Sequence, residues 1–361
     1  MSSDQHPSSS SSWIRGVNLG GWLVLERFIT PYLFAVTSCH IQGQFCWYPG
    51  QLSAPAGYTA CNLYHCKPHL LSYDPNGTSV VNATTDVRVN DTITTIDYPV
   101  DSWTLMSSFD SPKVAADYLN VHYENFLTFD HLKRLKEEGG VDYVRVPLPH
   151  WMLQNDTAAF GNTTTTTTAA PYLNAHGEPY VAGNMWFYFA RMVQWCQELN
   201  IQVWPDLHTA PGSQNGFDNS GHVNLFDGPT CQGWSGSPSR VNRTLELLQG
   251  IVQRIAKENM THTVTGFGIL NEPFKDCPPH VMQDYNQRAI RIVRETLGAN
   301  TSIYIADNFN ATLWNKPSSS STTATAATTS TPNEAYWNDN DPQSMDLYQN
   351  TFLDSHYYHG T

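Results

Sequence analysis

Short runs of β-branched and apolar residues alternate with amphipathic helical stretches along most of this chain. Strands are predicted at residues 13–19, 141–146, 201–207, 264–270, 302–306 and 351–356. Helices are predicted between them at residues 126–138, 185–199, 240–258 and 280–297. This alternation is typical of βα units around a parallel sheet. It restricts the fold to a doubly wound sheet or a (β/α)8 TIM barrel of the α/β class.

The residues at the strand ends distinguish between these two architectures. A nucleotide-binding sheet needs a glycine-rich turn after its first strand, and the pair Gly20–Gly21 followed by Trp22 is too sparse for one. The predicted strands end instead in polar groups, namely Asn18, Arg145, Asp206 with His208, Asn271 with Glu272, Asp307 with Asn308, and His356 with Tyr358. Because the strand ends of a barrel form one catalytic face, we predict the barrel.

Composition narrows the class of ligand. With 32 acidic against 19 basic residues, the net charge of −13 argues against a nucleic-acid-binding surface. Only 14% of the residues are charged while 12% are aromatic, which suits a neutral polar ligand. No apolar run reaches the length of about 18 residues that a transmembrane helix requires, so none is predicted in this chain.

Four segments fall outside the barrel pattern. Residues 1–12 are predicted to be a disordered serine-rich tail without the features of a signal peptide, and the barrel domain is predicted over 13–361. A cysteine-rich insertion is expected at about 35–110, and low-complexity loops at 155–170 and 317–332.

Cysteines and glycosylation sequons point to an oxidising compartment. Four of the seven cysteines fall within 28 residues, and nine Asn-x-Ser/Thr sequons occur. We therefore expect a disulfide-containing glycoprotein that is extracellular or at the cell surface. Two alternatives stay open: a chain this rich in Asn, Ser and Thr forms sequons by chance, and the Cys and His residues of 61–69 could hold zinc. The odd cysteine count leaves one thiol unpaired within this chain.

The sharpest local motif is Asn271-Glu272-Pro273 at the end of an apolar strand. Pro273 stops the strand and fixes the turn that aims Glu272 into a dry barrel mouth. Desolvation raises the pKa of a carboxyl group, as a general acid at neutral pH requires. Asn271 would bind a sugar 2-hydroxyl group, a contact that strengthens in the transition state. The alternative is an exposed turn that merely ends a strand.

Five blocks of sequence, in the same order, resemble the fungal-type exo-β-1,3-glucanases of glycoside hydrolase family 5. They are RGVNLGGWLVLE from Arg15 with ITP from Ile29, VRVP from Val144, DLHTAPGSQNGFDNSG from Asp206, NEP from Asn271, and DSHYY from Asp354. The resemblance covers residues 13–361 apart from the insertions. It implies a hydrolase that releases glucose from the non-reducing end of β-1,3-glucans with retention of configuration, without a metal or organic cofactor.

The resemblance also implies a role for each matching residue. Glu272 matches the acid/base carboxyl group, and Asn271 matches the neighbour that holds the 2-hydroxyl group. Five further residues match supporting positions: Arg145, which organises the nucleophile; His208, in the glucose subsite; His356 and Tyr358, near the nucleophile; and Glu26, on the non-reducing-end glucose. Taken singly, Arg145 could be a buried ion-pair partner, His208 a core histidine and Glu26 a solvated loop carboxylate.

The nucleophile that retention requires has no matching residue in this sequence. In the family it is a glutamate on the seventh strand, beyond the His-x-Tyr pair, whereas this sequence ends at Thr361. We therefore expect strands one to six without seven and eight, unpaired edges on strands one and six, and a nucleophile beyond residue 361. The 361-residue chain itself is then expected to be inactive. Replacement of the nucleophile by Asp206, Asp307 or Asp354 is the less favoured alternative.

Two alternative functions stay open. The first is a catalytically inactive glucan-binding protein that uses the same cleft. The second is a β-glucosidase or β-1,4-glucanase of the same family, because the 35–110 insertion lies next to Glu26 and could reshape the rim of the site. The expected partner in every case is a β-glucan polysaccharide or oligosaccharide, and the expected state is a monomer.

Overall fold

A computed structural model of the chain describes residues 14–35, 99–109, 111–154, 174, 176–224, 228–309 and 349–356, together with seven short strands between residues 40 and 93. The predicted tail, both low-complexity loops, the zinc alternative and Tyr358 lie outside the described residues. Within the described part, no helix is long and apolar enough to cross a membrane.

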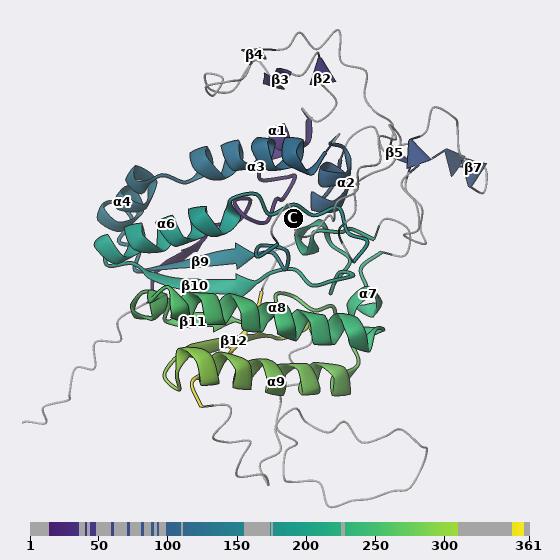
Figure 1. The fold of residues 1–361 in the computed structure, drawn as a ribbon. Helices are drawn as coiled ribbons and strands as arrows, with labels where there is room; N and C mark the ends of the chain where they lie inside the picture. Colours follow the sequence, from purple (N-terminus) through teal and green to yellow (C-terminus); the bar gives the residue numbers. More distant parts are fainter. Residues whose placement is uncertain are drawn as a thin grey trace, which may run out of the picture.

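Six parallel strands form one curled sheet in the order β1-β9-β10-β11-β12-β13 (Figure 1). They are β1 (Gly16–Asn18), β9 (Tyr143–Leu148), β10 (Gln202–Leu207), β11 (Gly266–Gly268), β12 (Ser302–Ala306) and β13 (Thr351–Asp354). The arrangement is an incomplete (β/α)8 barrel, which confirms the predicted fold class.

Helices cover the outer face of the curled sheet (Figure 1). The long ones are α3 (Pro112–Phe126), α4 (Phe129–Glu137), α6 (Met185–Glu198), α8 (Pro238–Lys257) and α9 (Pro279–Leu297). Short helices lie in the connections between these elements: α1 (Pro31–Ala35), α2 (Ser102–Ser107), α7 (Gln232–Ser235), η2 (Asp218–Ser220) and η3 (Met260–His262). The last three predicted helices agree with α6, α8 and α9 to within two residues at each end.

The helix predicted at 126–138 is α4, but it begins only at Phe129 and ends at Glu137. Phe126 ends α3, Leu127 is extended, and the side chain of Thr128 accepts a hydrogen bond from the His131 amide to begin α4. A threonine in this capping position satisfies a backbone N–H that a new helix leaves unpaired. The helix α3 was missed although a Ser-Pro pair at Ser111 marks its start.

The end of the range interpreted as an insertion belongs to the barrel. Helix α2 lies within 35–110, yet Leu105 and Met106 on it are fully buried in the core. Asp101 and Thr104 form a capping box that begins α2. Before it lie only short paired strands among the described residues: β2 (His40–Ile41), β3 (Gln44–Trp47), β4 (Thr59–Ala60), β5 (Leu71–Ser72), β6 (Val81–Asn82), β7 (Arg88–Val89) and β8 (Thr92–Ile93).

The six predicted strands are all present, with boundaries that differ by at most three residues. The strand predicted at 302–306 is β12, without change. The strand predicted at 264–270 shrinks to the three residues of β11, because the chain leaves the ladder after Gly268. The others, predicted at 13–19, 141–146, 201–207 and 351–356, become β1, β9, β10 and β13 with shifts of one to three residues at an end.

A row of aromatic rings fills the inside of the curled sheet. Tyr143 lies 4.5 Å from Trp204, Trp204 lies 4.6 Å from Tyr304, and Tyr304 lies 5.8 Å from Phe352, each between ring centroids. Gly266 on β11 leaves the room for two of them, since a Cβ there would lie 2.8 Å from Tyr304 and 2.9 Å from Trp204. Small residues on one strand thus accommodate large ones on its neighbours.

The row of aromatic rings is exposed to solvent where it ends, at Phe352 on β13. Among the described residues, β1 and β13 each pair along one side. Phe352 and Leu353 on β13 are 50% and 43% exposed, and Ile14 just before β1 is 64% exposed. The predicted unpaired edges with apolar side chains are present in the described part of the chain.

Candidate active site

Arg145 is the centre of a polar cluster at the carboxyl ends of the strands. Its Nη2 lies 3.0 Å from Asp206 Oδ2 and donates to Asn271 Oδ1 at 2.8 Å. Its Nη1 donates to Asn18 Oδ1 at 3.1 Å, and Asp354 Oδ2 lies 4.0 Å from Nη2. A guanidinium group has five donors in a fixed fork, so one side chain can tie together the ends of β1, β9, β10, β11 and β13.

Asp206 and His208 form the second part of the cluster. Asp206 is 3% exposed, and its Oδ2 lies 2.7 Å from His208 Nδ1. The other ring nitrogen of His208, Nε2, lies 3.4 Å from Asn271 Nδ2. Asp206 therefore holds both a guanidinium group and an imidazole. Gly268 makes this approach possible, because a Cβ there would lie 2.4 Å from Asp206 Oδ1.

Glu272 lies at the end of the segment after β11 and is 5% exposed. Its Oε2 accepts a hydrogen bond from Asn219 Nδ2 at 2.8 Å and lies 3.4 Å from Asn271 Nδ2. Its Oε1 lies 2.6 Å from His356 Nδ1. The backbone of Glu272 has a φ of 45°, a left-handed conformation that costs a non-glycine residue about 1–3 kcal/mol. Surrounding contacts must hold this turn in place, and the buried carboxylate contradicts the alternative of an exposed turn.

His356 lies between two carboxylates. Its Nε2 lies 3.2 Å from Asp354 Oδ2, opposite the contact of Nδ1 with Glu272. The hydrogen bonds to Asp354 and Glu272 raise the pKa of the His356 imidazole to about 10. Burial of Asp354 favours a higher pKa for its carboxyl group, but the hydrogen bond and charge of His356 and the charge of Arg145 lower that pKa overall. His356 is therefore a cation at neutral pH.

Glu26 follows β1 and faces the cluster rather than solvent. It is 8% exposed, which contradicts the alternative of a solvated loop carboxylate. Burial raises the pKa of its carboxyl group, the charges of Asp218 and Glu272 raise it further, and His208 and the Gly21 amide oppose them. These influences place Glu26 in the same electrostatic site as Glu272.

The loop after β10 contributes a residue that sequence reasoning missed. Asn219 lies on η2 and donates the 2.8 Å hydrogen bond to Glu272. It was quoted within the sixteen-residue block but was given no role, because nothing in the sequence pairs it with a carboxylate 53 positions away. The structure thus brings together Glu26, Arg145, His208, Asn271, Glu272 and His356, while Tyr358 lies outside the described residues.

Three phenylalanines on the loops after β10, β11 and β12 pack against one another. The ring of Phe217 lies 5.9 Å from that of Phe274 and 6.3 Å from that of Phe309, between centroids. Below the cluster, a cavity of about 260 Å³ is lined by Asn18, Arg145 and other residues of the curled sheet. A larger hollow of about 890 Å³ lies elsewhere, and none of the predicted site residues lines it. The cluster, rather than the larger hollow, is therefore the candidate site.

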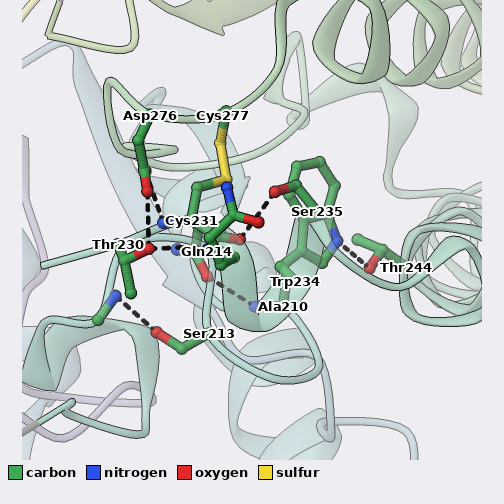
Figure 2. The surroundings of a disulfide bond; sticks show 12 residues. Ala210, Ser213, Gln214, Thr230, Cys231, Trp234, Ser235, Thr244, Asp276 and Cys277 are labelled. Atoms are coloured by element: carbon green, nitrogen blue, oxygen red, sulfur yellow. Dashed lines mark hydrogen bonds between the residues drawn. A yellow bond between two sulfur atoms is a disulfide. The ribbon is translucent and has the colours of Figure 1, made fainter. Parts of the chain in front are cut away.

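A disulfide fastens two of the loops around the site. Cys231, just before α7, is bonded to Cys277 in the segment after β11 (Figure 2). Asp276 accepts hydrogen bonds from the Thr230 hydroxyl and the Cys231 amide, both at 2.7 Å. Cys196 is a free, buried cysteine, and burial raises the pKa of its thiol to about 12. Within the described ranges, no group of three or more His, Cys, Asp or Glu side chains is placed to hold a metal ion.

Comparison with known proteins decides the family. The cellulase model of glycosyl hydrolase family 5 matches residues 107–361, which is most of the chain. The chain belongs to glycosyl hydrolase family 5.

The relatives of this family 5 chain include named glucosidases. It is 27% identical over 306 residues to a glucan 1,3-beta-glucosidase of Lachancea kluyveri, covering 84% of this chain and 51% of that protein. It is 29% identical over 303 residues to a probable glucan 1,3-beta-glucosidase A of Aspergillus niger, covering 83% and 50%. The resemblance to the exo-1,3-glucanase members of the family is thereby confirmed. The chain spans about half the length of these curated relatives.

A solved structure supports the fold. The crystal structure of AoRut superimposes with a TM-score of 0.50 at 16% sequence identity, covering 82% of this chain and 62% of that one. At this identity the likeness concerns the fold alone. It agrees with the incomplete barrel described above.

Proposed function

We propose that this family 5 chain carries the acid/base half of an exo-acting glucan 1,3-β-glucosidase that retains anomeric configuration. The observation that carries the proposal is the placement of Glu272, which is buried at the end of β11 and held by Asn219, Asn271 and His356. The names of the curated relatives support β-glucan as the substrate class. The product would be glucose from the non-reducing end.

Glu272 would act twice in this reaction. In its acid form it protonates the oxygen of the leaving sugar, and in its carboxylate form it activates the water that releases glucose. Asn271 would hold the 2-hydroxyl group, while Arg145 fixes the Asn271 side chain through its Oδ1 at 2.8 Å. Glu26 and His208 would bind the hydroxyl groups of the terminal glucose.

The contact of His356 with Glu272 bears on the order of these steps. An imidazolium donor stabilises a carboxylate partner, so the present contact favours the base form of Glu272. The acid form requires that His356 take another partner. A second carboxylate about 5–5.5 Å from Glu272, as retention requires, would compete for the same imidazolium. We propose that binding of His356 to the nucleophile frees Glu272 to become protonated.

We further propose that the nucleophile is a glutamate beyond residue 361. Two carboxylates that could replace it already have charged partners. Asp206 is paired with Arg145 and His208, and Asp354 is paired with His356. Withdrawing either one would break the cluster that positions Asn271 and Glu272. On this proposal the 361-residue chain binds glucan without hydrolysing it.

A β-1,4-glucan is the second candidate substrate. The observation that favours it is the matching family model, which is described as cellulase. The cluster itself would serve either linkage, because Glu272 and Asn271 contact the glucose unit being released. Residues around the rim, rather than the catalytic pair, would decide between the two.

The Cys231–Cys277 disulfide supports an oxidising location, so we propose an extracellular or cell-surface glycoprotein that acts as a monomer. Glycans on its sequons are part of this proposal.

The test compares the 361-residue chain with a form elongated by the codons that follow Thr361. Hydrolysis of laminarin is measured for both, and binding of laminari- and cello-oligosaccharides is measured by calorimetry, with Glu272→Gln as the inactive control. We expect both forms to bind laminari-oligosaccharides and only the elongated form to release glucose. Hydrolysis by the 361-residue chain would refute the placement of the nucleophile, and exclusive binding of cello-oligosaccharides would favour the second candidate.

A further inference from the structure

The segment that carries Glu272 has lost the regular hydrogen bonding of a strand. After Gly268, the Ile269 carbonyl accepts a hydrogen bond from the Tyr285 hydroxyl at 2.7 Å, and the Asn271 amide donates to the Leu207 carbonyl at 2.9 Å. The remaining backbone groups on either side of Glu272 need other partners, because buried polar groups left unpaired are costly.

Gln214 supplies those partners from the loop after β10. Its side chain is fully buried, and its Nε2 donates to the Asn271 carbonyl at 2.9 Å and to the His208 carbonyl at 2.8 Å. Its Oε1 accepts from the Ala210 amide at 3.0 Å. Its own carbonyl accepts from the Phe274 amide at 3.0 Å. Gln214 thus holds the residue before Glu272 and the second residue after it.

The left-handed backbone conformation of Glu272 requires such contacts on both sides. A left-handed turn at a non-glycine residue relaxes unless the flanking backbone is fixed, and a displacement of about 1 Å at a reacting group can cost about 100-fold in rate. Figure 2 shows that Gln214 lies close to Cys231, one end of the Cys231–Cys277 disulfide. The amide of Gln214 holds the turn by hydrogen bonds, and the disulfide holds the same segment by a covalent bond at Cys277.

We propose that Gln214 is a positioning residue, which fixes the Asn271–Phe274 turn so that the Glu272 carboxyl group points at His356 and the substrate. The proposal rests on the function assigned to Glu272 above. Gln214 itself touches no substrate in it, because its amide is consumed by backbone groups of the two loops. The competing interpretation is that Gln214 only stabilises the fold.

The test uses His356 as a reporter in the full 361-residue chain. Its Nδ1 lies 2.6 Å from Glu272 Oε1, so movement of Glu272 removes one of the two carboxylates that hold its proton. The other, Asp354, is on β13 and stays in place, with Arg145 Nη2 at 4.0 Å from its Oδ2. Titration of the His356 ring protons by NMR in Gln214→Met should therefore give a pKa lower than in the parent chain by about one unit or more.

A matched control removes a buried hydrogen bond elsewhere. The Thr244 hydroxyl, on α8, accepts a hydrogen bond from Trp234 Nε1 at 2.9 Å (Figure 2), and no hydrogen bond joins it to the described residues of the Asn271–Phe274 turn. Thr244→Val should lower the melting temperature without changing the titration of His356. A variant that merely loosens the fold would behave like this control.

The outcomes separate the two interpretations without any measurement of hydrolysis. A lowered pKa of His356 in folded Gln214→Met, with the control unchanged, supports positioning even if the chain proves to cleave no glucan. An unchanged titration in the folded variant overturns it. Gln214→Glu, which keeps the size but puts oxygen against two carbonyl groups, is the second variant if Gln214→Met does not fold. Failure of both to fold would also overturn the proposal, in favour of a structural role alone.

Discussion

The disulfide between Cys231 and Cys277 offers the most direct test of what holds the candidate site together. It closes a stretch of chain with a sequence separation of 46, which includes all of α8 and β11. Both cysteines are buried, so the variant Cys231→Ala/Cys277→Ala removes the bond without burying a new hydroxyl group. The hydrogen bonds of Asp276 remain in the variant, and the change is therefore confined to the covalent link.

The expected loss follows from the length of the closed loop. A cross-link removes conformational entropy from the unfolded chain, and for a separation of 46 the loop-closure relation gives about 13.5 cal/mol/K. At 25 °C this amounts to about 4 kcal/mol of the free energy of unfolding. Domains are stable by about 5–15 kcal/mol, so the loss is a large share of the total.

Equilibrium unfolding in urea under non-reducing conditions measures the difference. The control is Cys196→Ala, which removes one buried sulfur atom but no cross-link and should cost about 1 kcal/mol, as an average substitution does. We expect the double variant to lose several times more than the control. Equal losses would refute the reasoning, because they would mean that the unfolded chain gains no freedom when the bond is absent.

Three further predictions concern the polar cluster. Arg145→Met should lower the free energy of unfolding by about 3–5 kcal/mol in urea titrations, since it leaves Asp206 buried without its guanidinium partner; a loss below 1 kcal/mol would contradict this. Gly268→Ala should weaken laminari-oligosaccharide binding in calorimetry, because the new Cβ displaces Asp206. The raised pKa of His356 means that its stabilising contribution is complete below about pH 6.5 and is lost as pH rises toward about 10. In His356→Gln, the free energy of unfolding should depend less on pH across that range than in the parent chain. An unchanged pH dependence would exclude the His356 imidazole as its source.

Much of the fold could be predicted because it depends on periodicity. The strand at Ser302–Ala306 and the helix at Met185–Glu198 have uniform apolar faces, and both were placed to within one residue. Helix α3 was missed because its buried face mixes alanine with Tyr118 and His122, so no apolar stripe marks it. The same segment adjoins the insertion, and α2 was assigned to that insertion for the same reason.

The location of the candidate site could also be predicted from the repeating βα pattern, but its individual contacts could not. Polar residues at the ends of parallel strands meet at one face of the sheet. The sequence therefore predicted that Arg145, His208 and Glu272 lie close together. Their individual hydrogen bonds could not be derived. Asn219 reaches Glu272 from a separate loop, and Cys231 pairs with a cysteine 46 positions away. Such pairs depend on how far each loop folds back, which no local pattern records.

The glycines of β11 explain how Asp206 can contact both Arg145 and His208. A strand of three residues with Gly266 and Gly268 contributes almost no side chain to the inside of the sheet. The neighbouring strands therefore fill that space, and Asp206 comes close enough to the sheet axis to bind Arg145 and His208 at once. Because β11 has almost no side chains, it also contributes little packing to fix the segment that follows Gly268. The buried amide of Gln214 and the disulfide then have to fix the turn that a longer strand would have fixed by itself.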